Sequence, residues 1–325
     1  MRGGWKIVVP SYSNQGWQAY WKEGRLGSCV PENEETASEI QSRWVELLSD
    51  LSDGARVLDV ATGNGILLGH AEMAAKRNGK HYALTGVDLA PIDPARYVPD
   101  LSEGLQEARF LGGIPAERLP FEEGDFDVIL SQYGLEYADL GKALDEIKRV
   151  LVRSGRLIWL AHCEGSEVVD QNLDQDAQIS LLLAPGGPID AMTGLLAKLE
   201  KGKRSVHAET KLRVALSEAE KYCGEHPPAN VVREVCTIIA DTASRYQAYR
   251  LQDLKQMVMD SRKRLLAHRQ RINDLLAAVL RPDDIEFVRV QLAGPAWTSV
   301  SFSEMCVGVD SLPIGLLICA RRTGS

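Results

Sequence analysis

Short β-rich runs alternate with helical patterns between Arg56 and Ile158, and this alternation constrains the fold more than any other feature of the chain. It is typical of parallel strands joined by crossover helices. Before it, apolar residues at helical spacing in residues 35–51 predict a lead-in helix that packs one face on the sheet. The chain is therefore expected to form a doubly wound α/β sheet. We predict strands at residues 56–61, 82–88, 109–113, 126–131 and 156–162.

A long helical region interrupts this alternation. After the fifth strand, residues 166–280 show helical patterns that are broken at residues 185–188 and 224–228. Strand character returns only near the end of the chain, at residues 285–292 and 314–320. These late strands would complete a seven-stranded, mostly parallel sheet with a long all-helical insert after the fifth strand.

A glycine-rich turn ends the first predicted strand. The strand runs through Asp59 and Ala61 to Gly63 and Gly65, and a helical pattern follows. Glycines let a backbone approach a ligand closely, and the first turn of a helix offers free N–H groups. At the end of the second strand, Asp88 is placed to accept hydrogen bonds from both hydroxyls of a ribose. Together, the turn and the carboxylate predict a cofactor that contains a nucleoside.

Two later segments lie where the base and the reactive end of such a cofactor are expected. The first is a short loop, residues 117–121, before the fourth strand. The second comprises that strand and its exit, residues 126–137. Both segments therefore contribute candidate contacts.

In order and spacing, the motifs over residues 56–164 resemble those of class I S-adenosylmethionine-dependent methyltransferases, especially the small-molecule enzymes of ubiquinone and menaquinone biosynthesis. The resemblance implies a Rossmann-like methyltransferase fold, S-adenosyl-L-methionine as the cofactor, and methyl transfer as the activity. It implies that the glycine-rich turn holds the methionine portion, Asp88 the ribose, and the loop near Ala116 the adenine. The cofactor-binding residues predicted in these segments are Asp59, Ala61, Gly63, Gly65, Asp88, Leu89, Ala116, Glu117, Ser131 and Gln132.

One position departs from the family pattern, because Pro115 stands where these enzymes have an acidic residue just before the Ala–Glu pair. Backbone groups near Ala116 would then recognise the adenine. Two other classes remain as alternatives. A dinucleotide-binding dehydrogenase would prefer a third glycine where Leu68 stands. A non-catalytic protein that binds the same cofactor would share these motifs.

Methyl transfer from a sulfonium depends mainly on aligning the donor with the accepting atom. A general base is needed only when that atom carries a proton at the working pH. Tyr133, Glu136, Tyr137, His162 and Glu164 lie at the carboxyl ends of the fourth and fifth strands. We single out His162 and Tyr133 as catalytic candidates, His162 because the ordinary pKa of histidine suits a base. A purely structural histidine is the alternative.

The N-terminal segment, residues 12–25, is dense in aromatic residues for a chain that is only 6% aromatic. It is expected to fold over the cofactor as a lid, with its rings near the adenine or near the sulfonium through cation–π attraction. Tyr20 and Arg25 are therefore added to the predicted cofactor contacts. The alternative is that Trp17, Tyr20 and Trp21 only anchor a helix on the core.

The insert is basic within an acidic chain. Residues 201–281 hold 16 Lys and Arg against 9 Asp and Glu, whereas the whole chain has a net charge of −8. An apolar seam from Leu251 to Val279 alternates three- and four-residue spacings and predicts a long helix packed on another helix. That other helix is either residues 208–222 or the same helix of a second chain. The basic residues form either a solvated face or a surface for an acidic partner.

These patterns divide the chain into three predicted parts. Residues 1–34 form the N-terminal lid segment, and residues 35–165 and 281–325 form the S-adenosylmethionine-binding catalytic domain. Residues 166–280 form the helical insert, which serves as a substrate cap or in oligomerisation.

Composition narrows the partners. The six cysteines show neither metal-binding spacing nor a disulfide framework, so we predict no metal site and a reducing, cytoplasmic setting. No stretch approaches the apolar length that a membrane span needs, so no membrane partner is predicted. The acidic chain has no general attraction to nucleic acid. We therefore predict a small-molecule methyl acceptor, with RNA or protein as the alternative acceptor. Two copies of the chain could also form a homodimer through the insert.

Overall fold

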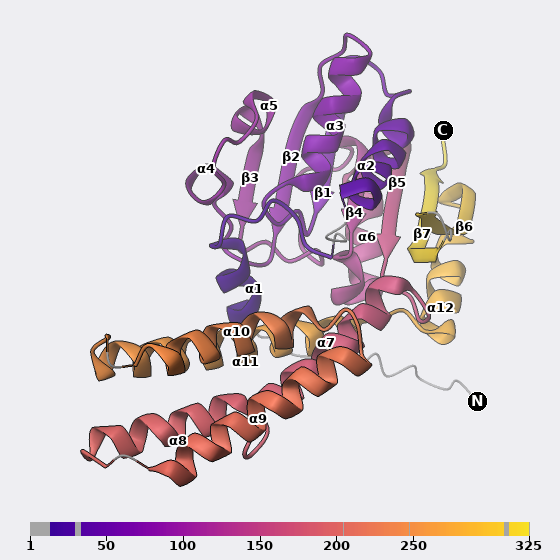
Figure 1. The fold of residues 1–325 in the computed structure, drawn as a ribbon. Helices are drawn as coiled ribbons and strands as arrows, with labels where there is room; N and C mark the ends of the chain where they lie inside the picture. The colour runs from indigo at the N-terminus through magenta and orange to yellow at the C-terminus, as the bar shows by residue number, and fades with distance from the viewer. Residues whose placement is uncertain (1–13, 30–33, 204, 247, 309–311, 325) are drawn as a thin grey trace. The chain divides into compact units, whose positions relative to one another are not determined.

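The computed structural model describes residues 14–29, 34–203, 205–246, 248–308 and 312–324 (Figure 1). Residues 1–13, which include the start of the predicted lid, lie outside the described residues. The chain divides into two compact units. Met1–Asp170 and Asp274–Ser325 make up the α/β unit, and Gln171–Asn273 make up the helical unit.

Within the described residues, seven strands form one sheet in the order β3-β2-β1-β4-β5-β7-β6. Neighbouring strands from β3 to β5 are parallel, whereas β7 is antiparallel to both β5 and β6. This confirms the predicted seven-stranded, mostly parallel sheet. The strands are β1 (Arg56–Val60), β2 (Ala83–Asp88), β3 (Arg109–Gly112), β4 (Phe126–Gln132), β5 (Leu151–Ala161), β6 (Trp297–Val307) and β7 (Leu312–Arg322).

The prediction of a strand at residues 285–292 is wrong, because Pro282–Leu292 forms helix α12. Proline is favoured at the first position of a helix, and the first turn also carries Asp283 and Asp284, which suit the positive end of the helix dipole. Val288 and Leu292 are buried four residues apart, on one face. Packing of that face therefore outweighs the β-branched residues that suggested a strand.

Side chains of the central strands alternate between two apolar clusters, one on each face of the sheet. On β4 and β5, Leu130 and Ile158 belong to one cluster, whereas Ile129 and Leu157 belong to the other. This two-residue period is the one a sheet covered on both faces requires. Helices α2 (Glu34–Leu48) and α3 (Ile66–Arg77) contribute to the first cluster, and α6 (Leu140–Val150) and α12 contribute to the second.

Shorter elements complete the α/β unit. They are α1 (Asn14–Trp21), α4 (Pro94–Tyr97), α5 (Glu103–Glu107) and the 3₁₀ helix η1 (Leu135–Tyr137).

The helical unit contains α8 (Pro188–Glu200), α9 (Val206–Glu225) and α10 (Asn230–Ser244), which pack on one another. Helices α7 (Glu167–Leu183) and α11 (Leu251–Ala278) run across its boundaries. Within α11, the predicted seam is half-buried at Leu251 and buried at its later apolar positions, which are Leu254, Val258, Leu265, Ile272 and Leu275. Thr242 of α10 donates to Met257 of α11. A homodimer through this helix stays a prediction.

One segment of the described residues, Glu167–Glu200, is long and apolar enough to cross a bilayer by length and composition alone. The expectation that no stretch approaches this length is therefore wrong. The segment is divided between α7 and α8, with a break at residues 184–187. In α8, Ile189, Met192 and Leu196 are buried, which is typical of a core helix.

The chain leaves the sheet after β5 and returns to the same place. The Leu280 N–H donates to the His162 carbonyl at 2.9 Å, and the Glu164 N–H donates to the Leu280 carbonyl at 3.4 Å. Both apolar clusters of the sheet consist entirely of residues of the α/β unit. The α/β unit therefore holds its own core.

We expect the α/β unit to fold without residues 171–273. Replacing them with a flexible Gly/Ser linker of about ten residues, which spans roughly 17 Å on average, should leave cooperative thermal unfolding and near-UV circular dichroism intact. We expect this because both apolar clusters of the sheet are built without any residue of the helical unit. A variant with native-like far-UV but lost near-UV signal would contradict this independence.

Candidate functional site

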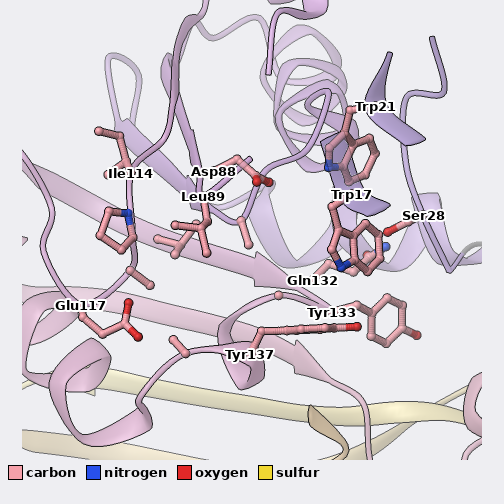
Figure 2. Close-up of a pocket in the computed structure, with 16 residues that line it drawn as sticks. Trp17, Trp21, Ser28, Asp88, Leu89, Ile114, Glu117, Gln132, Tyr133 and Tyr137 are labelled. Atoms are coloured by element: carbon pink, nitrogen blue, oxygen red, sulfur yellow. The ribbon is translucent and has the colours of Figure 1, made fainter. Parts of the chain in front are cut away.

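A cavity opens where β1, β2 and β4 end at their carboxyl side (Figure 2). It encloses about 830 Å³ of empty space, with its open mouth included. Most lining side chains are apolar or aromatic. The lining residues are Trp17, Trp21, Ser28, Val60, Ala61, Asp88, Leu89, Ile114, Pro115, Ala116, Glu117, Gln132, Tyr133, Gly134, Tyr137 and Ala138.

Asp88 joins the end of β2 to the glycine-rich turn. Its Oδ2 accepts a hydrogen bond from the Gly63 N–H at 2.8 Å, and its Oδ1 accepts one from the Ala90 N–H at 2.7 Å. Burial raises the pKa of Asp88 to about 6, although the two N–H donors act in the opposite direction. Each carboxylate oxygen has two lone pairs, so each can accept a further donor from the cavity.

Two buried acceptors beside the turn lack a donor in the part of the chain that the structure describes. Asp59 accepts from the Thr62 hydroxyl through Oδ2 at 2.7 Å, but its Oδ1 has no partner among the described residues. The Asn64 side-chain oxygen also has none there. Burial raises the pKa of Asp59 to about 8, against the effect of the Thr62 hydrogen bond. Buried acceptors are normally paired, so this turn has capacity for donors that the described chain does not supply.

The glycines of the turn make room for aromatic rings of the chain itself. A side chain at Gly63 would overlap the Trp21 ring, and one at Gly65 would come within 2.8 Å of the Phe110 ring. Both glycines have positive φ, 54° and 96°. Neither lines the cavity. Glycine at these two positions therefore lets the aromatic rings pack against the turn and lets the backbone adopt a positive φ.

Asn64 holds the N-terminal segment, residues 14–29, on this turn. Its Nδ2 donates to the Trp21 carbonyl at 2.9 Å and to the Arg25 carbonyl at 2.7 Å. Helix α1 thereby brings Trp17 and Trp21 into the cavity wall. The Trp17 ring meets the Tyr137 ring edge to face, with centroids 6.0 Å apart. The segment is thus both anchored to the core and part of the cavity.

Tyr20 and Arg25 do not line the cavity. The Tyr20 hydroxyl donates to the Gly27 carbonyl at 3.0 Å, and the Arg25 guanidinium lies over the Tyr20 ring, 5.3 Å from its centroid. A cation–π pair therefore forms within the segment itself. Trp17, Trp21 and Ser28 are the residues of this segment that face the cavity.

The end of the cavity away from α1 is formed by residues that follow β2 and β3 (Figure 2). Leu89, Ile114 and Ala116 line it with apolar groups. Glu117 also lines it, and its Oε1 accepts from the Asp139 N–H at 2.8 Å. The structure therefore brings the predicted contacts Leu89, Ala116 and Glu117 to the cavity that Asp88 lines.

Three further predicted contacts follow β1 or lie on β4. Ala61 and Gln132 line the cavity, and Gln132 accepts from the Trp44 indole N–H at 2.6 Å. Ser131 is fully buried behind it, donating to the Val60 carbonyl at 2.9 Å and accepting from the Leu135 N–H at 3.1 Å. Ser131 thus joins β1 to β4 rather than facing the cavity.

Tyr133 and His162 stack, with ring centroids 4.4 Å apart and an interplanar angle of 27°. Tyr133 lines the cavity, but its hydroxyl donates to the Ile314 carbonyl at 3.0 Å. Burial raises the pKa of Tyr133 well above its ordinary value. A hydroxyl bound in this way is a poor proton acceptor. His162 is fully buried and does not line the cavity, so the structure presents neither predicted catalytic residue to the cavity through a free polar group.

Sequence reasoning did not predict the contacts of three residues that shape this site. Trp21 appeared only within an aromatic segment, because its contact with Gly63 depends on how α1 folds back. Asn64 stands between two glycines, and a polar residue inside a glycine-rich turn was the available signal. Glu136 binds His162 across 26 residues of sequence, a pairing that no local pattern indicates.

Part of the chain is similar in sequence to known methyltransferases. Residues 58–159 match a family model described as a methyltransferase domain. Over 121 residues the chain is 32% identical to demethylmenaquinone methyltransferase of Thermotoga maritima, covering 37% of this chain and 48% of that relative. It is 39% identical over 124 residues to demethylmenaquinone methyltransferase of Thermus thermophilus, covering 36% and 53% respectively. The chain thus spans about half the length of the curated relatives it matches.

A solved structure shows a more distant likeness. Geranyl diphosphate C-methyltransferase from Streptomyces coelicolor, in complex with Mg²⁺, geranyl diphosphate and S-adenosyl-L-homocysteine, is 20% identical. The likeness covers 49% of this chain and 71% of that chain, with a TM-score of 0.35.

The contact between Gly63 and Trp21 can be tested with a matched glycine. Gly63→Ala should destabilise the protein more than Gly79→Ala, because both positions have positive φ but only Gly63 has a ring where the methyl group would lie. The left-handed backbone alone costs about 1–2 kcal/mol. In a Trp21→Ala background the excess should disappear, giving a coupling of roughly 0.5–3 kcal/mol in urea denaturation. Equal losses at the two glycines would contradict the contact.

Proposed function

From the match of residues 58–159 to a methyltransferase domain, we propose that these residues form a class I S-adenosylmethionine-dependent methyltransferase domain and that the protein transfers the methyl group of S-adenosyl-L-methionine to a small molecule. The observation that carries the proposal is Asp88, whose carboxylate lines the cavity while it binds the glycine-rich turn. Strand β2 and the turn after β1 are the two places where this family is expected to hold its cofactor. Their direct bond supports one shared site.

The residues present fit such a cofactor. Asp88 has an unused lone pair on each oxygen for two vicinal ribose hydroxyls. Asp59 and Asn64 have buried acceptors without partners among the described residues, which suit an ammonium group such as that of methionine. Leu89 and Ile114 supply apolar surface for a base, with backbone groups near Ala116 for its polar edge. When bound, the cofactor supplies an electrophilic methyl group on a sulfonium.

The chain's own part in the reaction is to position reactants and exclude water. Trp17, Trp21 and Tyr137 wall the cavity with aromatic rings, and the face of such a ring attracts a cation. Asn64 keeps α1 closed over the turn through its two bonds to Trp21 and Arg25. Holding two reactants in line in this way can supply effective molarities of about 10⁵–10⁸ M.

His162 is the proposed base for an acceptor that must lose a proton. It lies beside Tyr133 and, less closely, Tyr137, both of which line the cavity. Burial alone would lower the pKa of His162, but the neighbouring Cys29 and Glu136 outweigh it and raise the pKa to about 9. At neutral pH most of the imidazole would therefore already carry its second proton, and the neutral form that can act as a base would grow as the pH rises towards 9.

A small-molecule acceptor is supported by the mainly apolar wall of the cavity and by the net charge of −8. The helical unit is proposed to cap the substrate. The excess of basic residues over residues 201–281 favours a second candidate, methylation of RNA or protein held by that surface.

The proposal is tested by incubating the purified full chain with S-adenosyl-L-methionine labelled in its methyl group and a fractionated cell extract. Label in the small-molecule fraction is the expected result. Label in RNA or protein instead would favour the second candidate. Binding of the cofactor with no labelled product in any fraction would leave a non-catalytic binder and overturn the proposal.

Cofactor affinity should depend on pH through Asp88. Its pKa in the folded chain, about 6, is above the ordinary 3.8, so the folded state takes up a proton as the pH falls between these values. Below pH 6 the carboxylate that should accept both ribose hydroxyls is lost, and affinity should fall by up to about tenfold per pH unit. The same protonation removes the cost of burying a charged carboxylate. The contribution of Asp88 to the free energy of unfolding should therefore rise as the pH falls through about 6.

Asp88→Asn should weaken binding by roughly tenfold to a hundredfold at pH 7.5, because bonds to a charged acceptor are worth about 1.5–3 kcal/mol and 1.4 kcal/mol is a factor of ten. It should also flatten the fall below pH 6. Calorimetric titration measures both effects. Normal binding with an unchanged pH dependence would remove Asp88 from the ribose site.

A further inference from the structure

The cavity reaches only part of the site that the proposed function requires. It is lined by Asp88, Leu89 and Ala116, which are predicted contacts for the ribose and the adenine (Figure 2). The glycine-rich turn is predicted to hold the methionine portion, but Gly63 and Gly65 of that turn do not line the cavity. A ligand in the cavity therefore meets the nucleoside contacts without meeting these glycines.

The Trp21 ring occupies the space over the turn. A Cβ atom added at Gly63 would lie 2.4 Å from Trp21 Cη2, 2.5 Å from Cζ2 and 2.9 Å from Cζ3. Two carbon atoms in contact are about 3.5–4.0 Å apart, so the ring already packs directly on the Gly63 backbone. A ligand group has no room between the two. The methionine portion of a cofactor can therefore contact Gly63 only after the ring has moved.

Trp21 can move without breaking the core of the sheet. It is 6% exposed, yet it belongs to neither apolar cluster of the sheet. Its ring stacks on Trp17 and meets Tyr20 edge to face, and both residues lie on α1 itself. Trp21 is the last residue of α1, and Gly24, three residues later, has a positive φ of 78°. The ring and its helix can therefore shift together about the turn that follows.

Asn64 holds Trp21 in place. Its Nδ2 donates to the Trp21 carbonyl at 2.9 Å and to the Arg25 carbonyl at 2.7 Å, so one side chain joins the turn to both ends of this bend. Asn64 is itself 0% exposed and does not line the cavity. Its side-chain oxygen can therefore meet a ligand only when the segment that covers it has lifted.

We propose that Trp21 is a gate over the methionine end of the cofactor site and that Asn64 is its latch. The proposal rests on the proposed function. The nucleoside portion of a ligand reaches its contacts through the cavity, whereas the amino-acid portion reaches the turn only after Trp21 leaves Gly63. The free energy of opening therefore lowers the affinity for a ligand that has an amino-acid portion, and leaves the affinity for a nucleoside alone unchanged.

The test compares two ligands on the full chain by calorimetric titration and stopped-flow fluorescence. Adenosine carries only the nucleoside portion, whereas S-adenosyl-L-homocysteine carries the same nucleoside with an amino-acid portion. Neither has a sulfonium, so the attraction of the Trp21 ring for that charge does not enter. The observed binding rate of adenosine should rise linearly with concentration, whereas that of S-adenosyl-L-homocysteine should level off at the rate of gate opening.

Trp21→Phe shortens the ring over Gly63 and keeps an aromatic side chain on α1. It should speed association of S-adenosyl-L-homocysteine about tenfold or more and tighten its binding about fivefold, while both values for adenosine stay within about twofold. Trp297→Phe is the matched control, because it makes the same substitution at a ring that is 9% exposed and outside the cavity. It should change neither ligand.

The outcomes separate the gate from the proposed function. If both ligands bind and Trp21→Phe leaves the rate and affinity of S-adenosyl-L-homocysteine unchanged, the gate is overturned and the proposed function stands. Weaker binding of S-adenosyl-L-homocysteine in Trp21→Phe would make Trp21 a supporting wall, which also overturns the gate. Binding of neither ligand to the wild type would overturn the proposed function and the gate together.

Fluorine nuclear magnetic resonance of the full chain labelled with 5-fluorotryptophan follows the gate without any ligand. Asn64→Ala removes both latch bonds, so the Trp21 signal should show more exchange on the μs–ms timescale than in the wild type. Asn78→Ala is the matched control, because Asn78 Nδ2 donates to the Ala74 carbonyl at the far end of α3, and it should leave the Trp21 signal unchanged. A Trp21 signal without exchange in both the wild type and Asn64→Ala would overturn the gate.

Discussion

The hydrogen bond from the Gly63 N–H to the Asp88 carboxylate, 2.8 Å long, is the contact on which the candidate site depends. It ties the turn after β1 to the end of β2, at the edge of the sheet where parallel strands place their loops. The same turn carries Asn64, which in turn holds the N-terminal segment. The Asp88 carboxylate therefore fixes the turn on the sheet, and Asn64 of the same turn fixes the N-terminal segment on it.

Unpartnered polar atoms gather at this edge of the sheet. Asp59 Oδ1 and the Asn64 side-chain oxygen are both buried, and neither has a hydrogen-bond partner among the described residues. An unmade hydrogen bond costs about 1–3 kcal/mol, and native proteins leave few such groups. Their position beside the cavity walls is the arrangement expected of a site that completes its hydrogen bonds with ligands.

Aromatic packing gives this polar edge its shape. Trp21 covers Gly63, Trp17 meets Tyr137, and Tyr133 stacks on His162. These contacts join α1, the exit of β4 and the end of β5 around the cavity. A turn built only to approach a ligand would not need the Trp21 ring, so the small residues of the turn serve the protein's own packing as well as the proposed cofactor.

Local patterns in the sequence were sufficient for the strands from β1 to β5 and for the segments that line the cavity, such as Asp88 and Ala116. Strand alternation and glycine-rich turns are local signals, because they follow from backbone geometry over a few residues. Only the tertiary structure decided that residues 285–292 are helical, since packing of Val288 and Leu292 outweighed β propensity. It also decided that Trp21 rather than Tyr20 faces the cavity, and that Glu136 binds His162. Those outcomes depend on residues brought together from distant parts of the chain, which no local pattern records.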